Sequence, residues 1–260
     1  DLDVWTVLIG CFSSVDRLLE GEAKKKFGLI NKRLYGPVLD RLGWQPIPED
    51  SLRDLELRGL LIRSMVSLTR DPLSIERARN LHNKYLDDPS SVEPNIAAAV
   101  ATSVAINGSS ADYQIFVERF KKGITPQEER RYQMLLGAFP GDNEMSNTLQ
   151  MTLNGDIRTQ DAPYLLSFCL SNREQGPMVW SFIRDNWNQM IERFPDTAIV
   201  RMIGGIRSLT TQKTSAEIEE FFKENSVPTG ELTLSQTLEK LRVNVAFKIR
   251  ESQKLKDYLS

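Results

Sequence analysis

The sequence predicts an all-α protein: an irregular α-solenoid, HEAT- or armadillo-like, whose antiparallel helix pairs stack into a superhelix with a concave, bowl-like face. Apolar residues recur at helical spacing from end to end, and strand patterns hardly appear. Short Pro/Gly links divide the chain into about a dozen helices. No residue recurs at a fixed period, which argues against tetratricopeptide or ankyrin arrays. We expect residues 1–260 to form a single helical domain.

The first helix is predicted over residues 2–20, with apolar residues on one face. A second, over residues 22–42, contains Pro37, which we expect to kink it or divide it in two. Two prolines make residues 43–48 a rigid link. The face of the first helix consists of Val4, Leu8, Cys11, Val15 and Leu18.

Caps and glycines mark the later helices. Asp71-Pro72, Glu93-Pro94 and Thr125-Pro126 each place a proline in a first helical turn. Asn107-Gly108 and Pro140-Gly141 each end a helix. The helices expected after the link cover about residues 51–69, 71–86, 93–107, 110–122, 125–140, 143–153, 162–171, 176–194, 198–209, 215–224 and 233–258.

One of these helices carries a tryptophan-rich apolar face, with Asn186 at its edge. Steps of three and four residues place the apolar side chains on one side of a continuous helix. This pattern predicts a packing helix. Its apolar face consists of Trp180, Ile183, Trp187, Met190, Ile191 and Phe194.

Composition excludes several classes of function. A net charge of -2 gives no global attraction to nucleic acid or an anionic membrane, and no apolar run is long enough to span a bilayer. The chain enters a helical pattern at once from Asp1, without a methionine, so we expect it to be a fragment. Cys11 and Cys169 lie in apolar stretches without a CxxC motif, which predicts two buried free thiols and favours a cytoplasmic location.

The single histidine, His82, excludes a catalytic centre of the common kinds. A zinc-binding HExxH helix needs two imidazoles, and a serine triad would need a nucleophile elbow that the chain lacks. We expect His82 to be a solvated or packed helix residue. An independent enzyme is hard to sustain on this sequence, and no metal or cofactor site is predicted within it.

Two arginines are the candidate binding residues. Arg158 lies in a polar connector, and Arg201 lies among apolar neighbours. Each is expected either to pair with a carboxylate, which is the favoured interpretation, or to bind a substrate carboxylate through its guanidinium fork. Gly204-Gly205 indicates close helix packing or a local break, with the close approach of a ligand as the alternative. The adjacent acids Glu128 and Glu129 are expected on solvated faces.

Several motifs together resemble the C-terminal helical domain of zinc aminopeptidases of the aminopeptidase N and puromycin-sensitive aminopeptidase family, which also occurs in endoplasmic reticulum aminopeptidases. The resemblance covers nearly the whole chain. It depends on the order and spacing of Val4-Trp5, Leu42-Gly43-Trp44 with Pro46 and Pro48, Leu57-Arg58, Thr125 to Glu129, Ile157-Arg158-Thr159-Gln160-Asp161, Phe182 to Phe194, Phe221-Phe222, Gln236, Glu239 and Asn244.

The resemblance implies a function as part of a larger enzyme. The catalytic zinc would lie in an upstream domain of the same polypeptide, and this domain would enclose the active-site chamber, limit access and contact the distal end of peptide substrates. Arg158 and Arg201 are the expected contacts. The family domain usually begins earlier than Asp1, so the first helices are expected to be missing and an apolar face to be exposed around Val4, Leu8 and Val15.

A second hypothesis is a free-standing α-solenoid adaptor that binds a peptide or protein on its concave face. The apolar stripe on the first helix argues against it. The sequence does not indicate the substrate side-chain preference or the oligomeric state.

Overall fold

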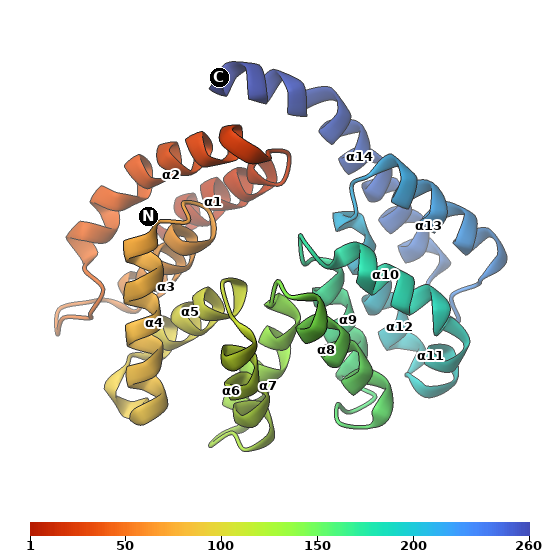
Figure 1. The fold of residues 1–260 in the computed structure, drawn as a ribbon, viewed down its shortest axis with the longest axis horizontal. Coiled ribbons are helices and arrows are strands. Elements are labelled where there is room, and N and C mark those ends of the chain that lie inside the picture. The colour runs from red at the N-terminus through yellow and green to blue at the C-terminus, as the bar shows by residue number, and fades with distance from the viewer. The chain divides into compact units, whose positions relative to one another are not determined.

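The chain is all-α, as predicted. A computed structural model describes residues 1–260 and contains fourteen α-helices, three short 3₁₀ helices and no strand (Figure 1). The α-helices are α1 (Leu2–Asp16), α2 (Gly21–Leu42), α3 (Leu52–Ser67), α4 (Pro72–Asp87), α5 (Pro94–Ile106), α6 (Ser110–Lys121), α7 (Pro126–Leu135), α8 (Asp142–Asn154), α9 (Ala162–Leu170), α10 (Gly176–Asp185), α11 (Trp187–Arg193), α12 (Asp196–Ile203), α13 (Gln212–Glu224) and α14 (Glu231–Leu259).

These helices form two compact units. Unit 1 comprises residues 1–107 together with residues 251–260, and unit 2 comprises residues 108–250. Helix α14 therefore begins in unit 2, while its last residues belong to unit 1. The expectation of one domain over residues 1–260 stays a prediction.

In unit 1, α3 packs against α1, α2, α4 and α5. Gly59 permits the close approach of α3 to α5, because a β-carbon at this position would lie 2.9 Å from the main-chain oxygen of Asn95. Three side chains of α3, Leu61, Ile62 and Met65, belong to the buried core of this unit.

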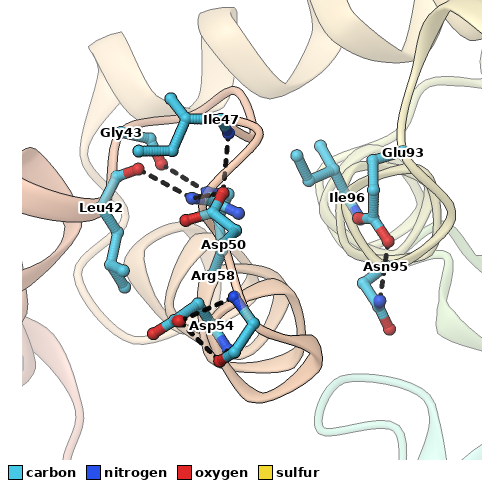
Figure 2. Close-up of polar contacts among 10 residues, drawn as sticks. Leu42, Gly43, Ile47, Asp50, Asp54, Arg58, Glu93, Asn95 and Ile96 are labelled. Atoms are coloured by element: carbon cyan, nitrogen blue, oxygen red, sulfur yellow. Dashed lines mark hydrogen bonds and ion pairs between the residues drawn. The ribbon is translucent and has the colours of Figure 1, made fainter.

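A buried arginine fixes the link between α2 and α3 (Figure 2). The Arg58 side chain is 0% exposed, and its guanidinium pairs with Asp50 at 2.6 Å. Arg58 also donates to the carbonyl oxygens of Leu42 and Gly43, at 2.9 and 3.1 Å. The main-chain N–H of Ile47 donates to Asp50 at 2.7 Å, so the charge pair holds both ends of the link.

In unit 2, α6 and α7 lie side by side (Figure 1), and α9 packs against α8, α10 and α12. Edge-to-face rings fill the core near α6 and α7: Phe116 lies 4.8 Å from Tyr132 and 5.1 Å from Phe139, measured between ring centroids. Such pairs stabilise a core by roughly 0.5–1.5 kcal/mol beyond the area that they bury. These ring contacts hold the inner face of α7 in the core. The residues on its other faces can therefore line a pocket at the surface.

Of the two outcomes expected at Pro37, a kink or a division of the helix, the structure excludes the division, and it corrects the prediction of one continuous tryptophan-rich helix. Pro37 lies within one helix, α2, and does not divide it. Because Pro37 is exposed, water can bond the carbonyl group that proline leaves without a donor. The tryptophan-rich helix is instead divided into α10 and α11 at Asn186, whose φ and ψ are -113° and 15°. Trp180 and Trp187 are nonetheless both buried, packed edge-on against Phe221.

The paired glycines serve both purposes that the sequence indicated. Helix α12 ends at Ile203 and a 3₁₀ helix follows over Gly204–Ser208, which is the local break. A β-carbon at Gly205 would lie 2.3 Å from the carbonyl oxygen of Ser167 and 2.6 Å from Cβ of Leu170, which is the close packing on α9.

Burial predictions at single residues gave mixed outcomes. His82 is buried in α4, which agrees with a packed helix residue. Val4 and Leu8 are exposed, as predicted, but Val15 is half-buried and packs against the cluster of Leu19, Phe27 and Leu259. The prediction of two buried thiols was wrong for Cys11, which is exposed on α1. The face that it shares with Val4 and Leu8 points to solvent.

Candidate functional site

The two candidate arginines, Arg158 and Arg201, are both exposed, and neither side chain forms an ion pair or hydrogen bond. The favoured expectation of carboxylate pairing was therefore wrong for both. Arg201 lies in the last turn of α12, where its side chain leaves the apolar face formed by Ile199, Met202 and Ile203. The apolar neighbours in sequence did not make it a buried residue, because they lie on the opposite side of the helix.

Arg158 lines a cavity of about 630 Å³ in unit 2, and Arg201 does not line it. The walls come from α6, α7 and the connector from α8 to α9. The lining residues are Phe120, Lys121, Pro126, Glu129, Arg130, Gln133, Asp156, Arg158 and Asp161. We call this cavity the unit 2 pocket.

Local structure explains how Arg158 reaches the unit 2 pocket. Helix α8 ends at Gly155, whose φ of 98° is a left-handed conformation that suits glycine. Ile157 is then buried and its N–H donates to the Met151 carbonyl at 3.1 Å, which anchors the connector. The Arg158 carbonyl accepts the N–H groups of Asp161 and Ala162 as α9 begins. The backbone of Arg158 is therefore fixed while its side chain stays in solvent.

Two ion pairs span the unit 2 pocket. Lys121 lies 3.7 Å from Asp156, and Arg130 lies 3.4 Å from Asp161. Half the Lys121 side chain is exposed, and pairs of this kind contribute only about 0–1 kcal/mol to stability. A charged ligand could displace either pair at small cost.

The neighbouring acids Glu128 and Glu129 have different environments. The expectation of a solvated face was wrong for Glu128, which is buried, lies 3.5 Å from Arg119 and accepts the Ile124 N–H at 2.8 Å. Glu129 points elsewhere, because adjacent helical residues diverge by about 100°. Glu129 is half-buried, lines the unit 2 pocket and forms no ion pair.

Sequence reasoning missed Gln133, which also lines the unit 2 pocket. Gln133 is only 7% exposed as a residue, and its side-chain amide forms no hydrogen bond within the chain, although its atoms are not among the fully buried unpaired ones. Because this amide lines the cavity and both donates and accepts hydrogen bonds, a ligand in the cavity can bond to it. The spacing of Glu129 and Gln133 by one helical turn is the signal that could have identified them as one face.

Metal ligands do not gather anywhere in the chain: no group of three or more His, Cys, Asp or Glu side chains could hold a metal ion. Both cysteines are free, as expected. Burial raises the pKa of the Cys169 thiol to about 12, so that thiol stays protonated and unreactive at neutral pH. No helix has the length and apolar character needed to cross a bilayer.

Comparison with known proteins identifies related chains. The model of the ERAP1-like C-terminal domain matches residues 1–243. Aminopeptidase M1-B of Oryza sativa subsp. japonica is 28% identical over 238 residues, which cover 89% of this chain and 27% of that protein. Aminopeptidase 2 of Candida albicans is 21% identical over 98% of this chain and 28% of its own length. Endoplasmic reticulum aminopeptidase 1 of Homo sapiens is 20% identical over 97% and 27%. The chain thus spans about a quarter of the length of these relatives.

Proposed function

We propose, because the chain belongs to the ERAP1-like C-terminal domain family, that it is the C-terminal domain of a zinc aminopeptidase that removes N-terminal residues from peptides. The observation that carries this proposal is the family match over residues 1–243 of 260. Three relatives from a plant, a fungus and an animal, each named an aminopeptidase, support it.

The chemistry of peptide cleavage would belong to another part of the enzyme. This chain offers no ligand set that fits zinc, so no catalytic step is assigned to its residues. Its partners would be the catalytic domain of the same polypeptide and the peptide substrate. The domain would act by shape and binding: stacked helix pairs forming a concave wall that encloses the chamber and limits access.

Within that wall, Arg158 and Arg201 would contact the distal end of the peptide. Support comes from their exposure and from the absence of any ion pair, since an unpaired guanidinium can donate two parallel hydrogen bonds to a carboxylate. A contact that binds the substrate and the transition state equally well lowers KM without raising kcat.

Kinetics of the full-length enzyme test these contacts. Arg158→Ala and Arg201→Ala should raise KM or change the preferred peptide length while changing kcat little. Arg63→Ala is the matched control, because Arg63 is also exposed and without an ion pair. If neither variant differs from this control in any kinetic constant, the two arginines are not substrate contacts.

The native gene product tests the assignment of the whole chain. A protein much longer than 260 residues that holds about one zinc ion per chain is expected. A metal-free product of only this length would overturn the proposal and favour a peptide-binding adaptor.

A further inference from the structure

We propose that the unit 2 pocket binds a zwitterion, namely a free amino acid or a short peptide with both termini unblocked. The ligand ammonium would lie at Glu129 and the ligand carboxylate at Arg158. The inference rests on the proposed function in one respect only, that Arg158 contacts a ligand.

The charged side chains that line the unit 2 pocket do not all pair with one another. Three cations and three carboxylates line it, and the ion pairs Lys121–Asp156 and Arg130–Asp161 satisfy two of each. Glu129 and Arg158 are what remains: one anion and one cation, each without an ion pair. A zwitterion supplies the two opposite charges that these residues lack.

Ligands of one charge fit less well. A simple anion attracted to Arg158 would also meet the carboxylates of Glu129, Asp156 and Asp161. A simple cation attracted to Glu129 would meet three basic side chains. A zwitterion leaves the net charge of the pocket unchanged, and each of its ends finds an opposite charge.

Gln133 is the second, independent observation. Its side-chain amide lines the same cavity, one helical turn after Glu129, and forms no hydrogen bond within the chain. An amide both donates and accepts hydrogen bonds, which suits the polar backbone of an amino acid or peptide. A ligand in the cavity that pairs with this amide gains a hydrogen bond that also orients it.

The volume of the unit 2 pocket and the residues that line it also suit a zwitterionic ligand. A cavity of about 630 Å³ lies within the range of small-molecule sites, roughly 300–1,000 Å³. Phe120 and Pro126 provide an apolar part of the wall, which a ligand side chain can contact. The pocket therefore combines two opposite charges, a free amide and an apolar surface.

Calorimetric titration of the full-length protein with leucine tests the proposal. Leucine should bind, while N-acetylleucine and leucinol, each lacking one of the two charges and neither cleavable by an aminopeptidase, should bind at least about tenfold more weakly. Variants of the pocket residues distinguish leucine binding in the unit 2 pocket from leucine binding elsewhere in the protein. Glu129→Gln and Arg158→Gln should each weaken leucine binding about tenfold, whereas the control variants Glu56→Gln and Arg63→Gln, at exposed positions in unit 1, should not.

Amino acids of increasing chain length distinguish the two ligand sources. β-Alanine, 4-aminobutanoate and 6-aminohexanoate separate the ammonium from the carboxylate by growing distances and cannot be hydrolysed by a peptidase. Tightest binding of leucine assigns the pocket to a free amino acid, and tightest binding of a longer compound assigns it to a short peptide. Binding that is equal for blocked and unblocked ligands, or unchanged in both pocket variants, would overturn the inference. A raised KM in Arg158→Ala without zwitterion binding would overturn it while leaving the proposed function intact.

Discussion

Arg58 is a charged side chain buried in the core of unit 1, and a single carboxylate, that of Asp50, neutralises its charge. Asp50 accepts its hydrogen bond at 2.6 Å, and only Nη1 of the guanidinium lacks a partner. Asp50→Ala would leave the buried charge uncompensated. We expect the free energy of unfolding to fall by about 3–5 kcal/mol, measured by urea denaturation.

The double variant Asp50→Ala with Arg58→Met is the control for that prediction. Removing both charges eliminates the desolvation cost, so it should recover much of the lost stability. If the double variant is less stable than Asp50→Ala alone, the arginine stabilises unit 1 through packing and main-chain hydrogen bonds, and not through its charge pair.

Ser51 and Asp54 form a capping box whose titration can be observed. The Ser51 hydroxyl and N–H both donate to Asp54, and these hydrogen bonds hold the pKa of Asp54 below its usual range. A lowered pKa in the folded state means that the stabilisation is present above the unfolded value of about 3.9 and is lost as pH falls through the folded pKa.

The matched measurement is an NMR titration of the Asp54 carboxyl group. Ser51→Ala removes the hydroxyl donor and should move the Asp54 pKa upward, while Ser14→Ala, in α1, should leave it unchanged. An unshifted Asp54 pKa in Ser51→Ala would show that the hydroxyl does not set it.

At the scale of elements, the sequence predicted helix starts better than helix continuity. Asp71 and Thr125 each cap a helix as expected, because a cap is a local contact within three residues. The break at Asn186 was missed. Trp187 packs edge-to-face against the rings of Phe221 and Phe222, a tertiary contact that no local pattern records.

The adjacent glycines Gly204 and Gly205 allow a matched test of helix packing. A β-carbon at Gly205 would lie 2.3 Å from the main chain of Ser167, whereas at Gly204 the nearest atom lies at 3.9 Å. Gly205→Ala should therefore destabilise unit 2 by about 1–3 kcal/mol through overpacking. Gly204→Ala should be neutral or slightly stabilising. Thermal unfolding measures both, and equal effects would mean that α9 can shift to make room.

At the scale of the whole molecule, the all-α class was predictable because helical periodicity is a property of short segments. The division into two units was not, since it depends on which distant helices pack together. The candidate site was half predictable. Arg158 stood out beside a polar connector, but Glu129 and Gln133 acquire meaning only when α7 and the α8–α9 connector face the same cavity.

The last residues of helix α14 belong to unit 1, so residues far apart in sequence complete that unit. Leu259 is 8% exposed and packs with Leu19 and Phe27, with Leu255 beside them. Leu259→Ala should therefore cost about 2–3 kcal/mol, near the lower end for a leucine truncation because the site lies close to the surface. Leu232, in the same helix but 72% exposed and within unit 2, is the matched control.

Hydrogen exchange assigns this loss to one unit. Leu259→Ala should lower amide protection in α1 and α2 and leave α9 unchanged, because Leu19 and Phe27 lose a partner while the contacts of α9 lie in unit 2. Leu232→Ala should change neither. A uniform loss of protection across α2 and α9 would mean that the two units unfold together, and the end of α14 would then stabilise the whole chain as one cooperative domain.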